Sequence, residues 1–209
     1  MRGNVRQIMA SVPEAVPQER LLRYNNGAVL LHWLTALIVV TQVIVGFTFA
    51  NMERGPARGD VFTLHKTLGA TILVLALIRL GWRIAHPPPP YPPELPRWER
   101  VSGVWTHRAF YFLLIALPLT GLIAVSGGAG AEGKTTTSLL GGIALPLIPG
   151  ISEEAGDTSG DVHILLVLIT LALLVLHIAA ALKHQFQHNR AAGRMPPFKT
   201  PGETAIPAS

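Results

Sequence analysis

The chain has 209 residues, and only 14% of them are charged, against about 25% in a typical soluble domain. The net charge is +5, and the basic residues lie between long apolar runs rather than on one polar surface, which favours a role in membrane orientation over nucleic-acid binding. There is no cysteine, so disulfides, cysteine-held iron–sulfur clusters and the C-x-x-C-H attachment of c-type haem are excluded.

Four apolar stretches predict membrane-spanning helices, because each has about the 20 residues that cross a hydrocarbon core and lipid offers the backbone no other partners. In chain order they are residues 28–50, 61–84, 106–125 and 162–182. We therefore predict an all-α, integral membrane four-helix bundle within a domain of residues 24–190. A cytoplasmic extension at 1–23 precedes it, and a disordered cytoplasmic tail at 191–209 follows it.

Two connections are unlike ordinary loops. Residues 86–93, between the second and third spans, form a stiff, proline-rich linker. Residues 138–151, in the third loop, are apolar but number only 14 and are interrupted by Gly141, Gly142, Pro146 and Pro149. They indicate an interfacial or re-entrant loop rather than a fifth span.

The positive charges predict the orientation of the bundle. Thirteen of the 17 Lys and Arg residues lie in the N-terminal segment, the second loop and the C-terminal tail, with the adjoining helix ends. Only four lie on the other side of the predicted membrane. Since basic loops remain in the cytoplasm, we expect both termini there (N-in/C-in).

Four of the eight histidines lie inside the predicted spans, where ionisable side chains are costly and by default indicate function. His163 and His177 are 14 residues apart on one helix, which places them on one face, about 21 Å apart along its axis. His32 matches the depth of His177, and His65 matches that of His163. Because two imidazoles from facing helices can fill both axial positions of a b-type haem, we predict two haem b groups. Their iron ligands are the pairs His32/His177 and His65/His163.

Other residues on the same helix faces fit a large, flat macrocycle. Gly46 and Gly69 leave room near the outer pair, although glycine also serves close helix packing. Arg79 and Arg83 fall on the His65 face at the inner end. There they either pair with the propionates of the inner haem or act as ordinary anchors on the cytoplasmic side.

Other chemistries explain the histidine pattern less well. A zinc site needs ligands that converge on one point, whereas these histidines are spread over both leaflets. A proton relay does not explain the paired depths, and a transporter is disfavoured because the predicted spans contain no Asp or Glu.

The motifs around these histidines resemble the bacterial cytochrome b561 family of the short, four-span kind. The matching stretches are Leu31-His32-Trp33-Leu34, Leu64-His65-Lys66-Thr67-Leu68-Gly69, Thr106-His107-Arg108, Ile115 through Leu122, Val162-His163 and Leu176 through His184. The resemblance covers roughly residues 22–197. It implies two haem b groups at the four histidines and electron transfer involving a membrane quinone. Some members oxidise superoxide at the outer surface and pass the electron to ubiquinone.

Two side chains are candidates for the points where electrons leave and enter. His184 lies two turns beyond His177 on almost the same face, where it can hydrogen-bond a quinone carbonyl and supply a proton. The resemblance supports this quinone contact; the alternative is a helix-end residue that interacts with the last carbonyls. Lys66, beside His65, is the best cation to guide superoxide, although the outer segments hold seven acidic residues against four basic ones.

Two further histidines receive lesser roles. His107 opens the third span and has no partner left at its depth, so we interpret it as a supporting or headgroup residue. His86, before the proline run, is interpreted as a helix-end residue.

The predicted function is therefore a membrane di-haem cytochrome that transfers electrons between an outer donor, superoxide in the enzyme hypothesis, and the quinone pool. The alternative is an electron-transfer subunit that docks a dehydrogenase or partner cytochrome and relays electrons to or from quinone. The long third loop departs from the family pattern, and it fits a docking surface at least as well as a small-anion site.

Overall fold

A computed structural model describes residues 23–187 and 190–195. Within them, four long α-helices each contain a stretch long and apolar enough to cross a membrane. They are α3 (Asn26–Asn51), α4 (Pro56–Ala85), α5 (Arg97–Ala131) and α6 (Glu153–Phe186). The predicted four-helix membrane bundle is confirmed, and every helix extends beyond its predicted apolar span.

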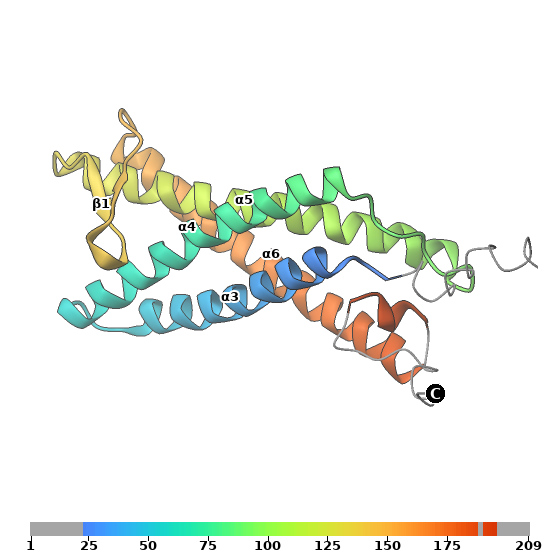
Figure 1. Ribbon diagram of the computed structural model, residues 1–209. Helices are drawn as coiled ribbons and strands as arrows, with labels where there is room; N and C mark the ends of the chain where they lie inside the picture. Colours follow the sequence, from blue (N-terminus) through green and yellow to red (C-terminus); the bar gives the residue numbers. More distant parts are fainter. Residues whose placement is uncertain (1–22, 188–189, 196–209) are drawn as a thin grey trace, which may run out of the picture.

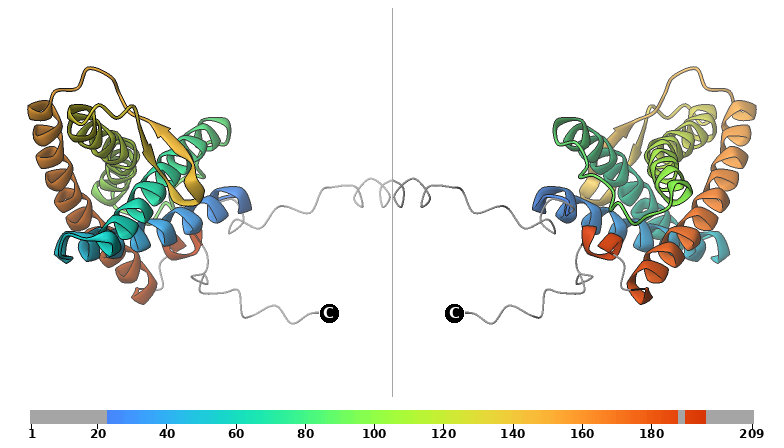
Figure 2. Two further views of the ribbon diagram at one scale, coloured as in Figure 1. Left: turned by 90° about the vertical axis from the view of Figure 1, so that its left-hand side faces the viewer. Right: turned by 90° about the vertical axis from the view of Figure 1, so that its right-hand side faces the viewer.

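The helices pack as two antiparallel pairs, α3 with α4 and α5 with α6, and contacts between α4 and α5 join the pairs. The pairs lie at an angle to each other, so the bundle is open in shape when viewed along its length (Figures 1 and 2). Following the predicted orientation, we call the end with the α4–α5 linker the inner end and the opposite end the outer end.

The surface of the bundle is more apolar than its interior. Leu30 and Val175 are 68% and 67% exposed, whereas Thr35 and Ser126 are each only 1% exposed. The buried hydroxyls donate to carbonyls one turn back in their own helices, such as Thr35 Oγ1 to Leu31 O at 2.7 Å. Small polar residues inside and large apolar residues outside are what a helix bundle in lipid requires.

The inner ends of α3 and α4 are fastened to each other by Asn25. Its side-chain oxygen caps α3 by accepting from Ala28 N at 2.9 Å, and it also accepts from Trp82 Nε1 at 3.1 Å. Gly27 lies so close to the Trp82 indole that a Cβ there would collide with the ring. The first turn of α3 therefore needs glycine to seat this tryptophan.

The fifth apolar stretch forms a hairpin rather than a helix. Strands β1 (Thr136–Ser138) and β2 (Ala144–Pro146) pair antiparallel, with Thr137 opposite Leu145. The turn contains the 3₁₀ segment η1 (Leu140–Gly142), where both glycines adopt left-handed φ values of 76° and 75°. The hairpin reaches from the outer end of α5 to α4 (Figure 1).

A short 3₁₀ helix, η2 (Arg190–Arg194), closes the inner end. The side chain of Arg194 is buried and donates to Pro90 O at 2.9 Å and Pro89 O at 2.6 Å, which ties the C-terminal segment to the proline-rich linker. Burial raises the pKa of the neighbouring Tyr91, whose ring lies 4.4 Å from the guanidinium. Of the predicted tail, residues 191–195 thus have a defined structure; residues 196–209, and residues 1–22 of the predicted extension, lie outside the described residues.

Helices α5 and α6 approach most closely at the outer end. A Cβ on Gly127 would lie 2.6 Å from Gly156 Cα and 2.8 Å from Ser152 O, so the two backbones meet with no room for a side chain. The neighbouring Gly128 has nothing within 4 Å of its Cβ position.

Gly127→Ala is therefore expected to force α5 and α6 apart and to lower stability by about 1–3 kcal/mol, the usual cost of overpacking. The apparent unfolding temperature of the purified protein, measured by fluorescence-detected size exclusion, should fall. Gly128→Ala makes the same change in the same helix turn without a clash. Equal unfolding temperatures for the two variants would show that the crossing tolerates a wider spacing.

Candidate functional site

The outer histidines face each other across the bundle. His65 of α4 and His163 of α6 have ring centroids 6.3 Å apart, with their planes at 75°. The Nδ1 atom of His163 lies 2.9 Å from Leu117 O and 3.2 Å from Thr120 Oγ1. Because a carbonyl only accepts, Nδ1 carries the ring proton, and the lone pair of Nε2 is left free.

The part of α5 around Pro118 forms the seat for His163. Thr120 contributes its hydroxyl, and its own carbonyl accepts from Ser159 Oγ at 2.9 Å, which links α5 to α6 one turn from the histidine. A Cβ on Gly121 would lie only 3.4 Å from His163 Nδ1 and Cε1. A side chain larger than glycine would therefore press on the ring.

His65 lies against α3. A Cβ on Gly46 would come within 3.2 Å of His65 Cε1, and the Phe49 ring lies 6.2 Å from the imidazole. Gln42 Nε2 donates to His65 O at 3.1 Å and lies 3.3 Å from its Nε2, while Gly69 faces this amide. Among the described residues, the buried atoms His65 Nδ1 and Gln42 Oε1 have no hydrogen-bond partner. The outer site thus contains buried polar atoms that lack a hydrogen-bond partner within the described protein.

Three imidazoles meet at the inner site. His32 of α3 and His177 of α6 have ring centroids 6.4 Å apart at 60°. His107 of α5 lies on another side of His177, with centroids 5.9 Å apart at 75°. Arg79 Nη2 lies 3.3 Å from His32 Nδ1. His107 therefore does have a neighbour at its depth, which differs from its interpretation as a headgroup residue.

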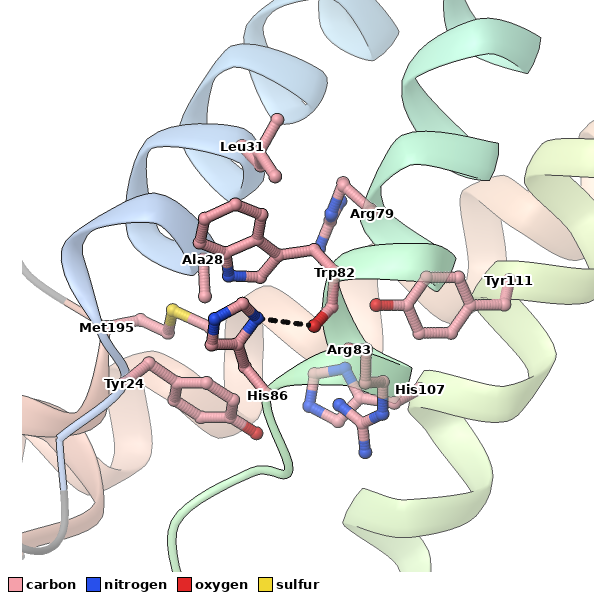
Figure 3. A pocket seen from close by; sticks show the side chains of 10 residues that line it. All are labelled: Tyr24, Ala28, Leu31, Arg79, Trp82, Arg83, His86, His107, Tyr111 and Met195. Atoms are coloured by element: carbon pink, nitrogen blue, oxygen red, sulfur yellow. Dashed lines mark hydrogen bonds between the residues drawn. The ribbon is translucent and has the colours of Figure 1, made fainter.

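A pocket lies beside this inner site, between α3, α4 and α5 (Figure 3). Arg79 and Arg83 are its cationic residues, and each guanidinium lies 5.9 Å from the Tyr111 ring. The remaining lining residues are aromatic, apolar or histidine: Tyr24, Ala28, Leu31, Trp82, His86, His107, Tyr111 and Met195. Among the residues that the structure describes, no acidic one lines the pocket, so its charge suits an anionic group. His86 caps α4 and stacks on Trp82 at 4.3 Å, as expected of a helix-end residue.

His184, near the end of α6, faces the start of α5. Its Nε2 lies 3.6 Å from Glu99 Oε2, and Lys183 Nζ donates to the other carboxylate oxygen at 2.7 Å. The Nδ1 atom of His184 is buried and has no hydrogen-bond partner among the described residues. The ring is thus fixed on one side and unsatisfied on the other.

Lys66 is held by the third loop. Its ammonium donates to Thr137 Oγ1 of the hairpin at 2.5 Å and lies 5.0 Å from the Phe62 ring. Nearby, Lys134 pairs with Glu132 at 2.5 Å, and this hydrogen bond lowers the pKa of the exposed Glu132 carboxyl. Lys66 and Lys134 therefore both donate to oxygen atoms of the third loop or of the adjoining end of α5.

A sequence model of prokaryotic cytochrome b561 matches residues 23–197. The chain belongs to this family. It is 28% identical over 165 residues to cytochrome b561 homolog 2 of Escherichia coli (strain K12), covering 78% of this chain and 85% of that protein. It is 28% identical over 170 residues to a probable superoxide oxidase, CybB, of Yersinia pestis, covering 78% and 89% respectively. The protein is thus a multi-pass prokaryotic membrane cytochrome that functions in electron transfer. Membership of the family implies that it binds haem b.

The histidine pairs of this cytochrome b561 fit that cofactor. A metal–nitrogen bond is about 2.0 Å long, and a ring nitrogen lies about 1.2 Å from the imidazole centroid, so two rings on opposite sides of one metal have centroids about 6.4 Å apart. The observed separations are 6.3 Å and 6.4 Å. The fixed Nδ1 proton of His163 adds the outer hydrogen bond that metal-binding histidines usually have.

Sequence reasoning missed several residues that support these rings. Gln42 contacts His65, and Thr120 and Ser159 support His163, but polar residues in apolar helices carry no spacing signal of their own. His107 was interpreted as a supporting or headgroup residue without a neighbour at its depth, because pairing by depth considers the level of a residue in the membrane and not the side of the ring that it approaches.

The inner site yields a test, because either His32 or His107 could complete a pair with His177. We expect His32→Ala to lose the inner haem and so to halve the haem content, whereas His107→Ala should keep both haems with a small spectral shift. Reduced-minus-oxidised spectra with haem quantification distinguish the two. The reverse result would assign the inner pair to His107 and His177.

Proposed function

We propose that this cytochrome b561 holds two haem b groups, one between His65 and His163 and the other between His32 and His177. The observation that carries the proposal is the pair of imidazole separations, 6.3 Å and 6.4 Å, at two levels of one helix. The two α6 ligands are 14 residues apart, about 21 Å along the axis, so the two sites serve opposite leaflets.

Bound haem would supply one-electron redox chemistry at each level, and the chain supplies ligands, charge and protons. Arg79 and Arg83 give the inner site positive charge for the propionates, since their pocket contains no carboxylate of its own. Gly46 and Gly121 keep side chains away from the outer imidazoles. Gly69, which faces Gln42, keeps the same region uncrowded.

We propose that electrons enter at the outer end and leave to ubiquinone at the inner end. Reduction of one quinone to quinol takes two electrons and two protons, so two superoxide anions, each losing one electron to become O₂, would supply one quinone. His184 is the residue proposed to contact the quinone carbonyl. Its unpartnered Nδ1 supports the assignment, and the Glu99 carboxylate, 3.6 Å from Nε2, can stabilise the protonated ring.

We further propose that both termini are cytoplasmic and that the membrane is the bacterial inner membrane. The distribution of Lys and Arg supports this orientation. The tryptophans support a membrane–water interface at the inner end, because all four lie on helix segments near it: Trp33, Trp82, Trp98 and Trp105.

Superoxide is the proposed donor, and Lys66 is the proposed cation that guides it. The name of the Yersinia pestis relative supports this substrate class. The second candidate is a relay subunit that receives electrons from a docked redox protein. The Lys66–Thr137 hydrogen bond favours it, because a cation already bonded to the loop is less available to a small anion.

Superoxide generated in the absence of any partner protein distinguishes these candidates. We expect it to reduce the purified protein, and Lys66→Gln to slow that reduction roughly threefold or more at low salt through loss of local attraction. Lys134→Gln, which removes a cation already paired with Glu132, should have a smaller effect. A normally coloured protein that superoxide fails to reduce would favour the relay subunit.

His184→Ala is expected to slow electron transfer to a soluble ubiquinone analogue by about 100-fold, the lower limit for loss of a general acid, and to leave the haem spectrum unchanged. Gln187→Ala, one turn further along and exposed, is the matched control. Stopped-flow oxidation of the pre-reduced protein measures the rate. If His184→Ala and the control transfer electrons equally fast, the quinone does not depend on this side chain.

A further inference from the structure

The hairpin of the third loop has the composition of a segment in contact with lipid. Residues 135–152 contain no charged side chain, although Glu132 and Lys134 precede them and Glu153 and Glu154 follow them. A loop of this length on a water-exposed surface usually carries charge, because polar composition keeps it solvated. The uncharged run includes both strands and the turn.

The hairpin has one face on the protein and one face outward. Leu147 is only 8% exposed, and Ile148 N donates to Ser126 Oγ of α5 at 3.0 Å. By contrast, Leu140 and Ile143, on either side of the turn, are 49% and 63% exposed. Adjacent large apolar side chains with no protein against them mark a surface that something else covers.

The backbone of the turn is largely satisfied, which low-polarity surroundings require. Leu139 N donates to Ile143 O at 2.8 Å, and Gly142 N donates to Leu139 O at 3.2 Å. Leu140 N donates to the side chain of Thr67 on α4 at 2.9 Å. The turn is therefore closed on itself and attached to a helix, so it can enter an apolar layer without leaving these donors unpaired.

The attachment points give the level of the hairpin in the membrane. Thr67 and Lys66 lie on the apolar part of α4, 11 and 10 residues from its first residue, so the turn lies beside the membrane-crossing part of the helix. The outer interface also lacks the usual aromatic anchors, because every Trp and Tyr of the chain lies toward the inner end. An apolar hairpin at this level would supply the missing anchor.

We propose that this hairpin binds the lipid of the outer leaflet, with Leu140 and Ile143 at the boundary between headgroups and acyl chains. A protein partner fits the surface less well, because an uncharged patch offers no charge pairs to orient a redox protein. Burial of two such side chains in an apolar layer is favourable. Lys66, which is a residue of α4, is thus contacted by the hairpin from the membrane side.

The test uses the natural absence of cysteine, which makes any introduced thiol unique. Ile143→Cys is labelled with an environment-sensitive fluorophore in the haem-loaded, full-length protein and placed in phosphatidylcholine–phosphatidylglycerol vesicles. We expect a blue-shifted emission that lipid-borne nitroxide near the headgroups quenches at least twofold more than aqueous iodide does.

Glu132→Cys, on an exposed side chain near the start of the loop, is the water-facing control and should show the opposite preference for the two quenchers. Leu140→Cys is the second position, in case the first variant loses its haem. Quenching of both hairpin positions by iodide, as in the control, would overturn the proposal. So would a blue-shifted emission that lipid nitroxide does not quench, because that would show a protein or a second copy of this chain on the surface.

Discussion

The burial of imidazole rings between helices that face lipid is the constraint on which the other features depend. Each ring has two nitrogens, and in a bilayer neither can turn to water for a partner. His163 shows how the protein meets this requirement, since Leu117 O fixes the proton on Nδ1 and leaves the lone pair of Nε2 free. An iron atom between the rings would bind the ring nitrogens that have no partner in the protein. The cofactor would thus supply partners that the bundle interior lacks.

Small residues determine where the helices can meet and where they must stay apart. The contact of Gly127 with Gly156 brings α5 and α6 together at the outer end. Gly46 and Gly121 instead face imidazoles, where an added Cβ would come within 3.2 Å and 3.4 Å of a ring atom and leave no spare room. The same residue type therefore serves two purposes, close backbone crossing at one place and space for a flat group at another. Membrane helices can use glycine in this way because lipid provides little drive to pack large apolar side chains inward.

The sequence predicted the spans and the histidine pairs because both follow from regular helix geometry. Depth along a helix is known once the residue number is known, so His32 and His177 could be matched without any structure. The rotation of one helix about another is not encoded so simply. For that reason His107, interpreted as a supporting or headgroup residue, was not placed beside His177, and Arg79 was not expected against His32 Nδ1. The third loop was predicted as interfacial from its composition, but its hairpin depends on contacts with α4 that no local pattern reports.

The two ends of the bundle are built differently, and this difference bears on the direction of electron flow. The inner end has arginines, tyrosines and a third imidazole around the His32–His177 pair. Near the outer pair, Lys66 is bonded to an uncharged loop, and the Arg58 guanidinium lies over the Phe49 ring that flanks His65. Positive charge stabilises a reduced, more negative site, so the inner arginines would favour reduction of a haem bound between His32 and His177. That preference is in the direction that the proposed function requires, from the outer end to the inner end.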